Sequence, residues 1–62
     1  MIARMTAAKL RALRKRLEMS QAELAKAIGY KDRRTLAKME QGARQVSEAV
    51  ELRVSRLVKE LP

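Results

Sequence analysis

The chain of 62 residues contains no cysteine and no histidine. Their absence excludes disulfides, thiol nucleophiles and metal sites built on imidazole or thiolate. Ser20, Ser47 and Ser55 have no histidine to activate them, and Gly29 and Gly42 alone cannot form a glycine-rich phosphate loop. We therefore expect no enzymatic activity, no metal and no cofactor. The lack of cysteine also fits the reducing cytoplasm.

Aromatic residues and long apolar runs are equally scarce. Tyr30 is the only aromatic residue, whereas modules that bind single-stranded nucleic acid stack bases on several aromatic side chains. An RNA-recognition sheet or an OB-fold is therefore disfavoured. No apolar run approaches the ~20 residues that a transmembrane helix needs, so we expect no membrane span.

Positive charge, by contrast, is abundant. Fifteen Lys and Arg residues stand against seven Asp and Glu residues, which leaves a net charge of +8. Such a surface attracts polyanions, and double-stranded DNA is the favoured one once modules for single strands are disfavoured. Two alternatives stay open: charge that only keeps the protein in solution, and a basic amphipathic first helix that binds an acidic membrane surface.

Apolar residues recur at helical spacing along the whole chain, and no segment has the alternation of a strand. A first helix is expected to follow the cap Thr6 and to run to Leu17, with Leu10 and Leu13 facing inward. A second helix begins at Ser20, because the sequence SQAE has the pattern of a capping box.

Gly29 is expected to end the second helix and to allow close crossing of the next one. A third helix then runs from the N-cap Asp32 to Gly42, with Leu36 and Met39 facing inward. The last helix, over roughly residues 46–61, carries an apolar stripe. Its members are Val46, Val50, Val54, Leu57 and Leu61. The pattern predicts a small all-α four-helix bundle that forms a single domain over residues 1–62.

Several segments together are typical of one DNA-binding family. They are LRALR from Leu10, SQAELA from Ser20, IG from Ile28 and TLAKMEQG from Thr35. In these residues the chain resembles the Cro and repressor-like helix-turn-helix family, also called the XRE family. The resemblance implies a lambda-repressor-like fold and a phage or bacterial repressor of transcription that binds a palindromic operator as a dimer. An antitoxin-type or protein-interaction helix-turn-helix module is the alternative.

Two features depart from the usual pattern of that family. The segment from Gly29 to Leu36 is one residue longer than in most relatives, and the extra residue lies in the turn between Tyr30 and Arg33. Glu18 stands at a position where the family often has glycine.

In the family, the third helix lies in the major groove of DNA. When the family's pattern is aligned on Leu36, the positions that would face the groove are Arg33, Arg34 and Lys38. Arginine suits this place because it can donate to guanine O6 and N7 together, although one of the two arginines could instead hold a phosphate. The resemblance assigns contacts with the DNA backbone, which position the protein, to a second set of residues. These are Ser20, Gln21, Lys31, Gln41 and Arg44.

The resemblance also pairs Arg14 of the first helix with Glu40 of the third. A partly buried ion pair would fix these two helices together, and the alternative is two unlinked surface charges. Other cations, Arg11 among them, are expected to supply only a general positive field.

A lone reading helix covers only a few base pairs, so a homodimer on DNA is expected. Leu52 lies off the apolar stripe of the last helix. Together with Ser55 and Arg56 it is the expected contact with a second copy of the chain.

Overall fold

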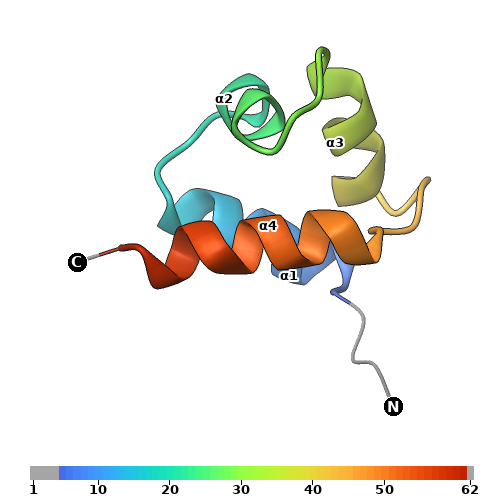
Figure 1. The fold of residues 1–62 in the computed structure, drawn as a ribbon. Helices are drawn as coiled ribbons and strands as arrows, with labels where there is room; N and C mark the ends of the chain where they lie inside the picture. The colour runs from blue at the N-terminus through green and yellow to red at the C-terminus, as the bar shows by residue number, and fades with distance from the viewer. Residues whose placement is uncertain (1–4, 62) are drawn as a thin grey trace.

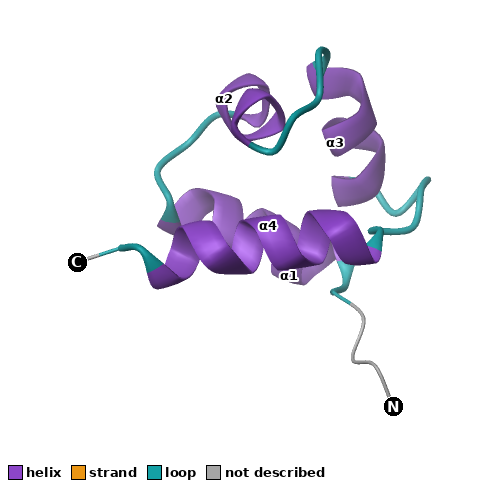
Figure 2. Ribbon diagram, in the orientation of Figure 1, coloured by secondary structure: helices purple, strands orange, loops and turns teal. Residues whose placement is uncertain are grey.

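The computed structural model describes residues 5–61, which form four helices joined by short loops (Figure 1). The helices are α1 (Ala7–Arg16), α2 (Gln21–Ala27), α3 (Arg33–Glu40) and α4 (Glu48–Lys59). The described residues contain no strand, as Figure 2 shows. The all-α fold with four helices that the sequence predicts is confirmed.

The helices are arranged as a pair with a second pair above it. α1 and α4 pack against each other, α3 packs on both α1 and α2, and α2 and α3 lie to one side of the α1–α4 pair (Figure 1). The last turn of α3 lies close to this pair, whereas its first turn lies farthest from it (Figure 1). The N-terminal end of α3 therefore projects from the body of the molecule.

All four helices contribute to one apolar core. Its buried members are Leu10, Leu24, Ala25, Ile28, Leu36, Met39, Val46, Val50 and Val54. Leu13 and Leu17, which share a face of α1 with Leu10, are partly buried against it. The faces predicted from helical spacing are thus the buried ones. A core this small gives limited stability, so the contacts at helix ends and between charged groups matter more than in a larger domain.

Each helix begins with a residue whose side chain accepts a hydrogen bond from a backbone N–H of the first turn. The four contacts join Thr6 Oγ1 to Lys9 N–H (3.1 Å), Ser20 Oγ to Glu23 N–H (3.1 Å), Asp32 Oδ1 to Arg34 N–H (2.9 Å) and Ser47 Oγ to Val50 N–H (3.3 Å). At α2 the predicted capping box is complete, since the Ser20 backbone N–H also donates to Glu23 Oε1 at 2.9 Å. This backbone bond, with the Ser20 hydroxyl contact second, lowers the pKa of Glu23 below its ordinary value.

The expected start of the last helix at Val46 is wrong. α4 begins at Glu48 because Ser47 has extended backbone (φ −75°, ψ 157°) and caps it. Val46 lies outside the helix but is still buried, with 6% of its surface exposed. At the other end, Leu61 lies beyond α4 and is 36% exposed, so the apolar stripe is no longer buried at its last member.

The C-terminal ends of α1, α2 and α3 share one geometry. In each, the residue after the C-cap has a positive φ, and two backbone N–H groups close back onto the last turn as in a Schellman motif. At α2, Gly29 N–H donates to Lys26 O at 3.2 Å and Tyr30 N–H donates to Ala25 O at 2.8 Å. The residues with positive φ are Glu18 (58°), Gly29 (95°) and Gly42 (80°).

Glu18 differs from the two glycines because its Cβ is crowded in left-handed backbone. It nevertheless completes the same motif: Glu18 N–H donates to Lys15 O at 3.0 Å, and Met19 N–H donates to Arg14 O at 3.3 Å. The place where relatives often carry glycine is therefore one where the backbone favours glycine. This chain holds a strained residue there.

Replacing Glu18 by glycine should stabilise the protein. We expect Glu18→Gly to raise the free energy of unfolding by about 0.5–1 kcal/mol, because the relieved strain exceeds the added freedom of the unfolded chain. In a domain of this size, 1 kcal/mol corresponds to about 4–8 °C in Tm, which thermal unfolding followed by circular dichroism can resolve. Glu18→Gln is the control, since it removes the charge and keeps the strain. An equal gain in both variants would show that strain is not the cause.

Candidate nucleic-acid interface

The turn between α2 and α3 determines where α3 starts. It covers residues 28–32, in which Tyr30 is partly buried against the core while Lys31 and Asp32 are exposed. Because Asp32 caps the helix, α3 starts at Arg33. The extra residue of this turn is therefore accommodated before the helix begins, and the helical register from Arg33 onward is continuous.

α3 has one buried and one exposed face. Leu36 and Met39 are buried. With about 100° of rotation per residue, Arg34 and Lys38 lie on the opposite side of the helix, one turn apart, and both are exposed. Arg33 is also exposed, but it lies about 100° from Arg34 around the helix axis. The three predicted groove-facing residues are thus all at the surface, and two of them share the face directed away from the core.

The guanidinium of Arg34 is held only loosely. Its side chain is 82% exposed, and its Nε lies 3.1 Å from Asp32 Oδ2, a carboxylate that is itself half exposed. Exposed ion pairs of this kind contribute about 0–1 kcal/mol. Arg34 can therefore exchange Asp32 for another acceptor at small cost, from the end of α3 that projects from the molecule.

The structure brings Arg14 and Glu40 together in a two-pronged contact. Arg14 Nε donates to Glu40 Oε2 at 2.7 Å, and Arg14 Nη2 donates to Glu40 Oε1 at 3.1 Å. The Glu40 side chain is only 2% exposed and that of Arg14 is 16% exposed. Arg14 Nη1 also donates to Met19 O at 3.0 Å, in the loop that leads to α2. One guanidinium thus joins α1, the start of α2 and the end of α3.

Two further side chains converge on Glu40. Gln21 Nε2, from the first turn of α2, donates to Glu40 Oε1 at 3.4 Å, so this glutamine braces α3. Arg11 Nη2 donates to the backbone carbonyl of Glu40 at 3.1 Å. The assignment of Arg11 to a general positive field is therefore wrong, because it bonds to the C-terminal end of α3. The sequence does contain a signal for this contact. Arg11 stands three residues before Arg14, and that spacing places both side chains on adjacent parts of one helix surface.

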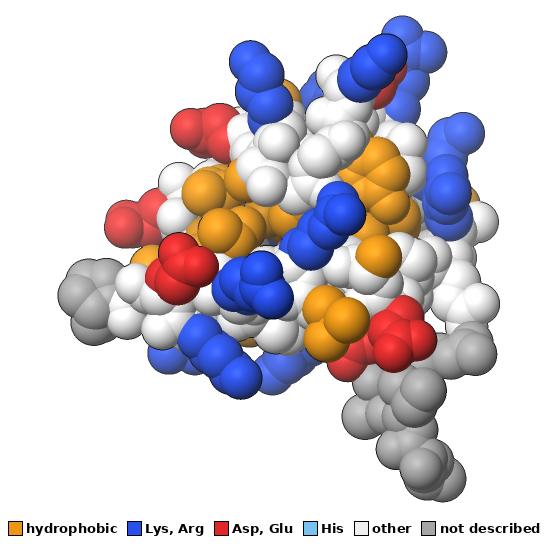
Figure 3. All heavy atoms as spheres, viewed as in Figure 1, with side chains coloured by type: hydrophobic (Ala, Val, Ile, Leu, Met, Phe, Trp, Pro, Cys, Tyr) orange, Lys and Arg blue, Asp and Glu red, His pale blue; other side chains and the backbone are white. Residues whose placement is uncertain are grey.

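The residues expected to contact DNA phosphates lie around α2 and α3. Ser20 and Gln21 are at the start of α2, Lys31 is in the turn, and Gln41 and Arg44 follow α3. All are exposed except Gln21, which is partly buried. In the space-filling view, Lys and Arg side chains stand along the upper and right edges of the molecule, over α2 and α3 (Figure 3).

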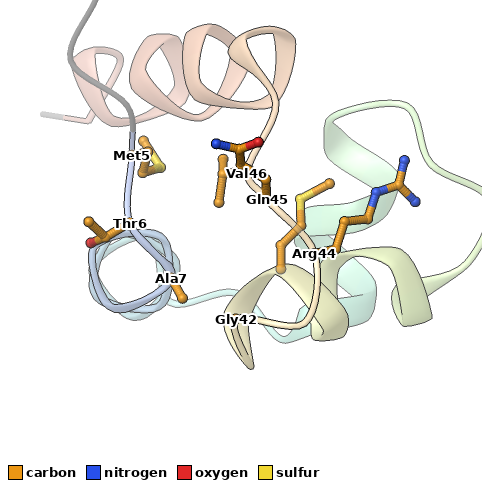
Figure 4. Close-up of a pocket in the computed structure, with 8 residues that line it drawn as sticks. Met5, Thr6, Ala7, Gly42, Arg44, Gln45 and Val46 are labelled. Atoms are coloured by element: carbon orange, nitrogen blue, oxygen red, sulfur yellow. The ribbon is translucent and has the colours of Figure 1, made fainter.

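Other kinds of site find little support in residues 5–61. A hollow of about 280 Å³ separates the start of α1 from the loop after α3 (Figure 4). Met5, Met39 and Val46 line it, and the guanidinium of Arg44 points away from it (Figure 4). The described part of the chain contains no group of three or more His, Cys, Asp or Glu that could hold a metal ion. It also contains no helix long and apolar enough to cross a membrane.

Removing the partner of Glu40 should destabilise the fold strongly. We expect Arg14→Met to lower the free energy of unfolding by about 3–5 kcal/mol, because it leaves a buried carboxylate without its main donor. Urea unfolding followed by circular dichroism measures this loss. The double variant Arg14→Met/Glu40→Leu should recover most of the stability, and Lys15→Met is the exposed control. If the double variant were as unstable as the single one, the buried charge would not be the cause.

The helix-turn-helix family HTH_3, which comprises domains of the XRE, Cro and C1 type, matches residues 10–57, more than half of the chain. That segment includes all of α2 and α3 and most of α1 and α4. No curated protein matches the chain. The family is one of DNA-binding domains and not of enzymes. The chain therefore belongs to the HTH_3 family of helix-turn-helix domains, and its function is to bind DNA.

Proposed function

We propose that this protein is a transcriptional regulator, a phage or bacterial repressor that recognises a specific sequence in double-stranded DNA. The observation that carries the proposal is the exposed face of α3. Arg34 and Lys38 stand there opposite the buried Leu36, on a helix whose first turn projects from the molecule. A helix of this shape and charge fits the major groove.

The residues of this face are proposed to contact different parts of the DNA. Arg34 donates to guanine O6 and N7, and Lys38 reaches similar acceptors one turn further along the helix. The exposed ion pair between Arg34 and Asp32 is weak, so Asp32 competes little with a base for the guanidinium. Arg33 lies to the side of this face, where a phosphate is the nearer acceptor.

Contacts with the DNA backbone fix the position of α3 in the groove. Ser20 and Gln21 present the N-terminal end of α2, whose free N–H groups and dipole favour a phosphate. Lys31 lies before α3, and Gln41 and Arg44 lie after it. Because these residues flank the reading helix at both ends, they set its depth and tilt. The two charged ones, Lys31 and Arg44, add to the dependence on salt.

The division between reading and anchoring can be tested with two variants. On a duplex selected from a random pool, Arg34→Ala should cost about 1–3 kcal/mol of binding free energy, and the loss on random duplex should be smaller. Lys31→Ala should weaken both duplexes by the same factor and reduce the slope of log K against log salt by about 0.9.

Fluorescence anisotropy over a series of salt concentrations provides both quantities. Lys59→Ala, an exposed charge at the C-terminal end of α4, serves as the control. Equal losses on the two duplexes for Arg34→Ala would refute base reading by this residue. A wild-type protein without any salt-dependent affinity for duplex DNA would instead favour a protein-interaction module.

The same proposal includes a homodimer formed through α4. Leu52 is 64% exposed, in the middle of the side of α4 that faces away from the core. Glu48 and Arg56 lie one turn before and one turn after it, and both are exposed. If two copies of α4 pack antiparallel across a two-fold axis at Leu52, Glu48 of each protomer faces Arg56 of its partner. Ser55 is partly buried and contributes less than this trio.

This pairing can be tested by exchanging charges. Glu48→Arg and Arg56→Glu should each weaken cooperative binding to a palindromic duplex by at least about tenfold, because like charges then meet across the axis. The double variant has the net charge of the wild type and should regain cooperativity. The measurement compares binding to full and half palindromes in a gel-shift titration. A double variant as defective as either single one would argue against this register.

A further inference from the structure

Arg53 of α4 forms a contact that the sequence does not suggest. Its Nη1 donates to the backbone carbonyl of Ile28 at 2.6 Å. Ile28 is the C-cap of α2, directly before the turn that leads to α3. The last carbonyls of a helix have no partner within the helix and carry its negative dipole end, so a guanidinium there is a favourable donor.

Gly29, the next residue, is fitted to the same guanidinium. A Cβ built on Gly29 would lie only 2.9 Å from Arg53 Nη1. Gly29 also has a φ of +95°, and this left-handed backbone is the reason that the position favours glycine, because the end of the flexible Arg53 side chain could move away from a Cβ. The sequence suggests that this glycine lets the two helices cross closely. In the structure, the space beside this glycine is also occupied by the guanidinium of an arginine from the last helix.

The bond from Arg53 to Ile28 joins α4 to the turn that precedes the reading helix. α4 otherwise packs mainly on α1, whereas α3 packs on α1 and α2. The turn itself is one residue longer than is usual in the family. After the buried Ile28, Tyr30 is its one residue that is partly buried against the core. A longer turn permits more directions for α3. The Arg53 bond restricts this freedom by joining the turn to α4.

We propose that Arg53 is a positioning residue for DNA recognition: by binding the Ile28 carbonyl, it fixes the direction in which α3 presents Arg34 and Lys38. The inference rests on the proposed function, because it assumes that α3 reads bases. Its action is indirect, since Arg53 stands on α4 and acts through the turn. Loss of the contact should therefore reduce discrimination between DNA sequences more than it reduces general affinity for DNA.

The test measures discrimination, which a purely structural role would leave unchanged. Affinities for the selected duplex and for random duplex are determined for wild type and Arg53→Met, at a temperature where both are folded. Arg53→Met should lower the ratio of the two affinities by about 2–30-fold. Lys59→Met is the matched control: it removes one exposed positive charge from α4, the helix that carries Arg53, and should leave the ratio unchanged.

Two further measurements keep the result decisive. Arg53→Lys retains a charged donor and should restore part of the ratio of the two affinities. If Arg53→Met does not fold, Arg53→Lys takes its place as the test, and its ratio is expected to be below that of wild type. In ¹H–¹⁵N spectra, the Gly29 and Tyr30 amide signals should shift in Arg53→Met and not in Lys59→Met.

An unchanged ratio in the Arg53 variants, with wild type still discriminating, would overturn the role of Arg53 alone. A wild type that does not discriminate between the duplexes would overturn the proposed base reading as well.

Discussion

The buried carboxylate of Glu40 is the group on which the arrangement of the first three helices depends. Arg14 from α1 holds it with two hydrogen bonds, Gln21 from α2 adds a third, and Arg11 binds the backbone carbonyl of the same residue. A buried charge of this kind is costly unless it is fully paired, so the three helices must keep one relative position to satisfy it. The apolar core holds the helices together, and the contacts of Glu40 fix their relative positions.

This constraint matters for the proposed mode of binding because it fixes one end of α3. The last turn of α3 is held by Glu40 near α1, while its first turn, which carries Arg34, projects outward. At the projecting end the control comes from the turn, through the Asp32 cap and the bond from Arg53 to Ile28. The two ends of α3 are thus restrained by different helices, α1 at the buried end and α4 through the turn.

Much of this could be predicted from the sequence where the cause is local. Thr6, Ser20 and Asp32 are expected to cap helices, and each does so, because capping depends on a few adjacent residues. The start of α4 is misplaced in the prediction because Val46 continues the helical spacing, although Ser47 is the better cap. Helical spacing identifies which residues are apolar on one face, but it does not reveal that a residue such as Val46 can be buried from an extended loop.

The amino-acid sequence alone establishes the set of four helices, their buried faces and the basic character of the surface, since these follow from spacing, caps and charge. The resemblance to a family adds the pairing of Arg14 with Glu40. Only the tertiary packing shows that Arg11 joins that cluster and that Arg53 reaches the turn after α2. Arg53 and Ile28 lie 25 residues apart, and a contact over that distance in sequence depends on how helices cross, which no local pattern records.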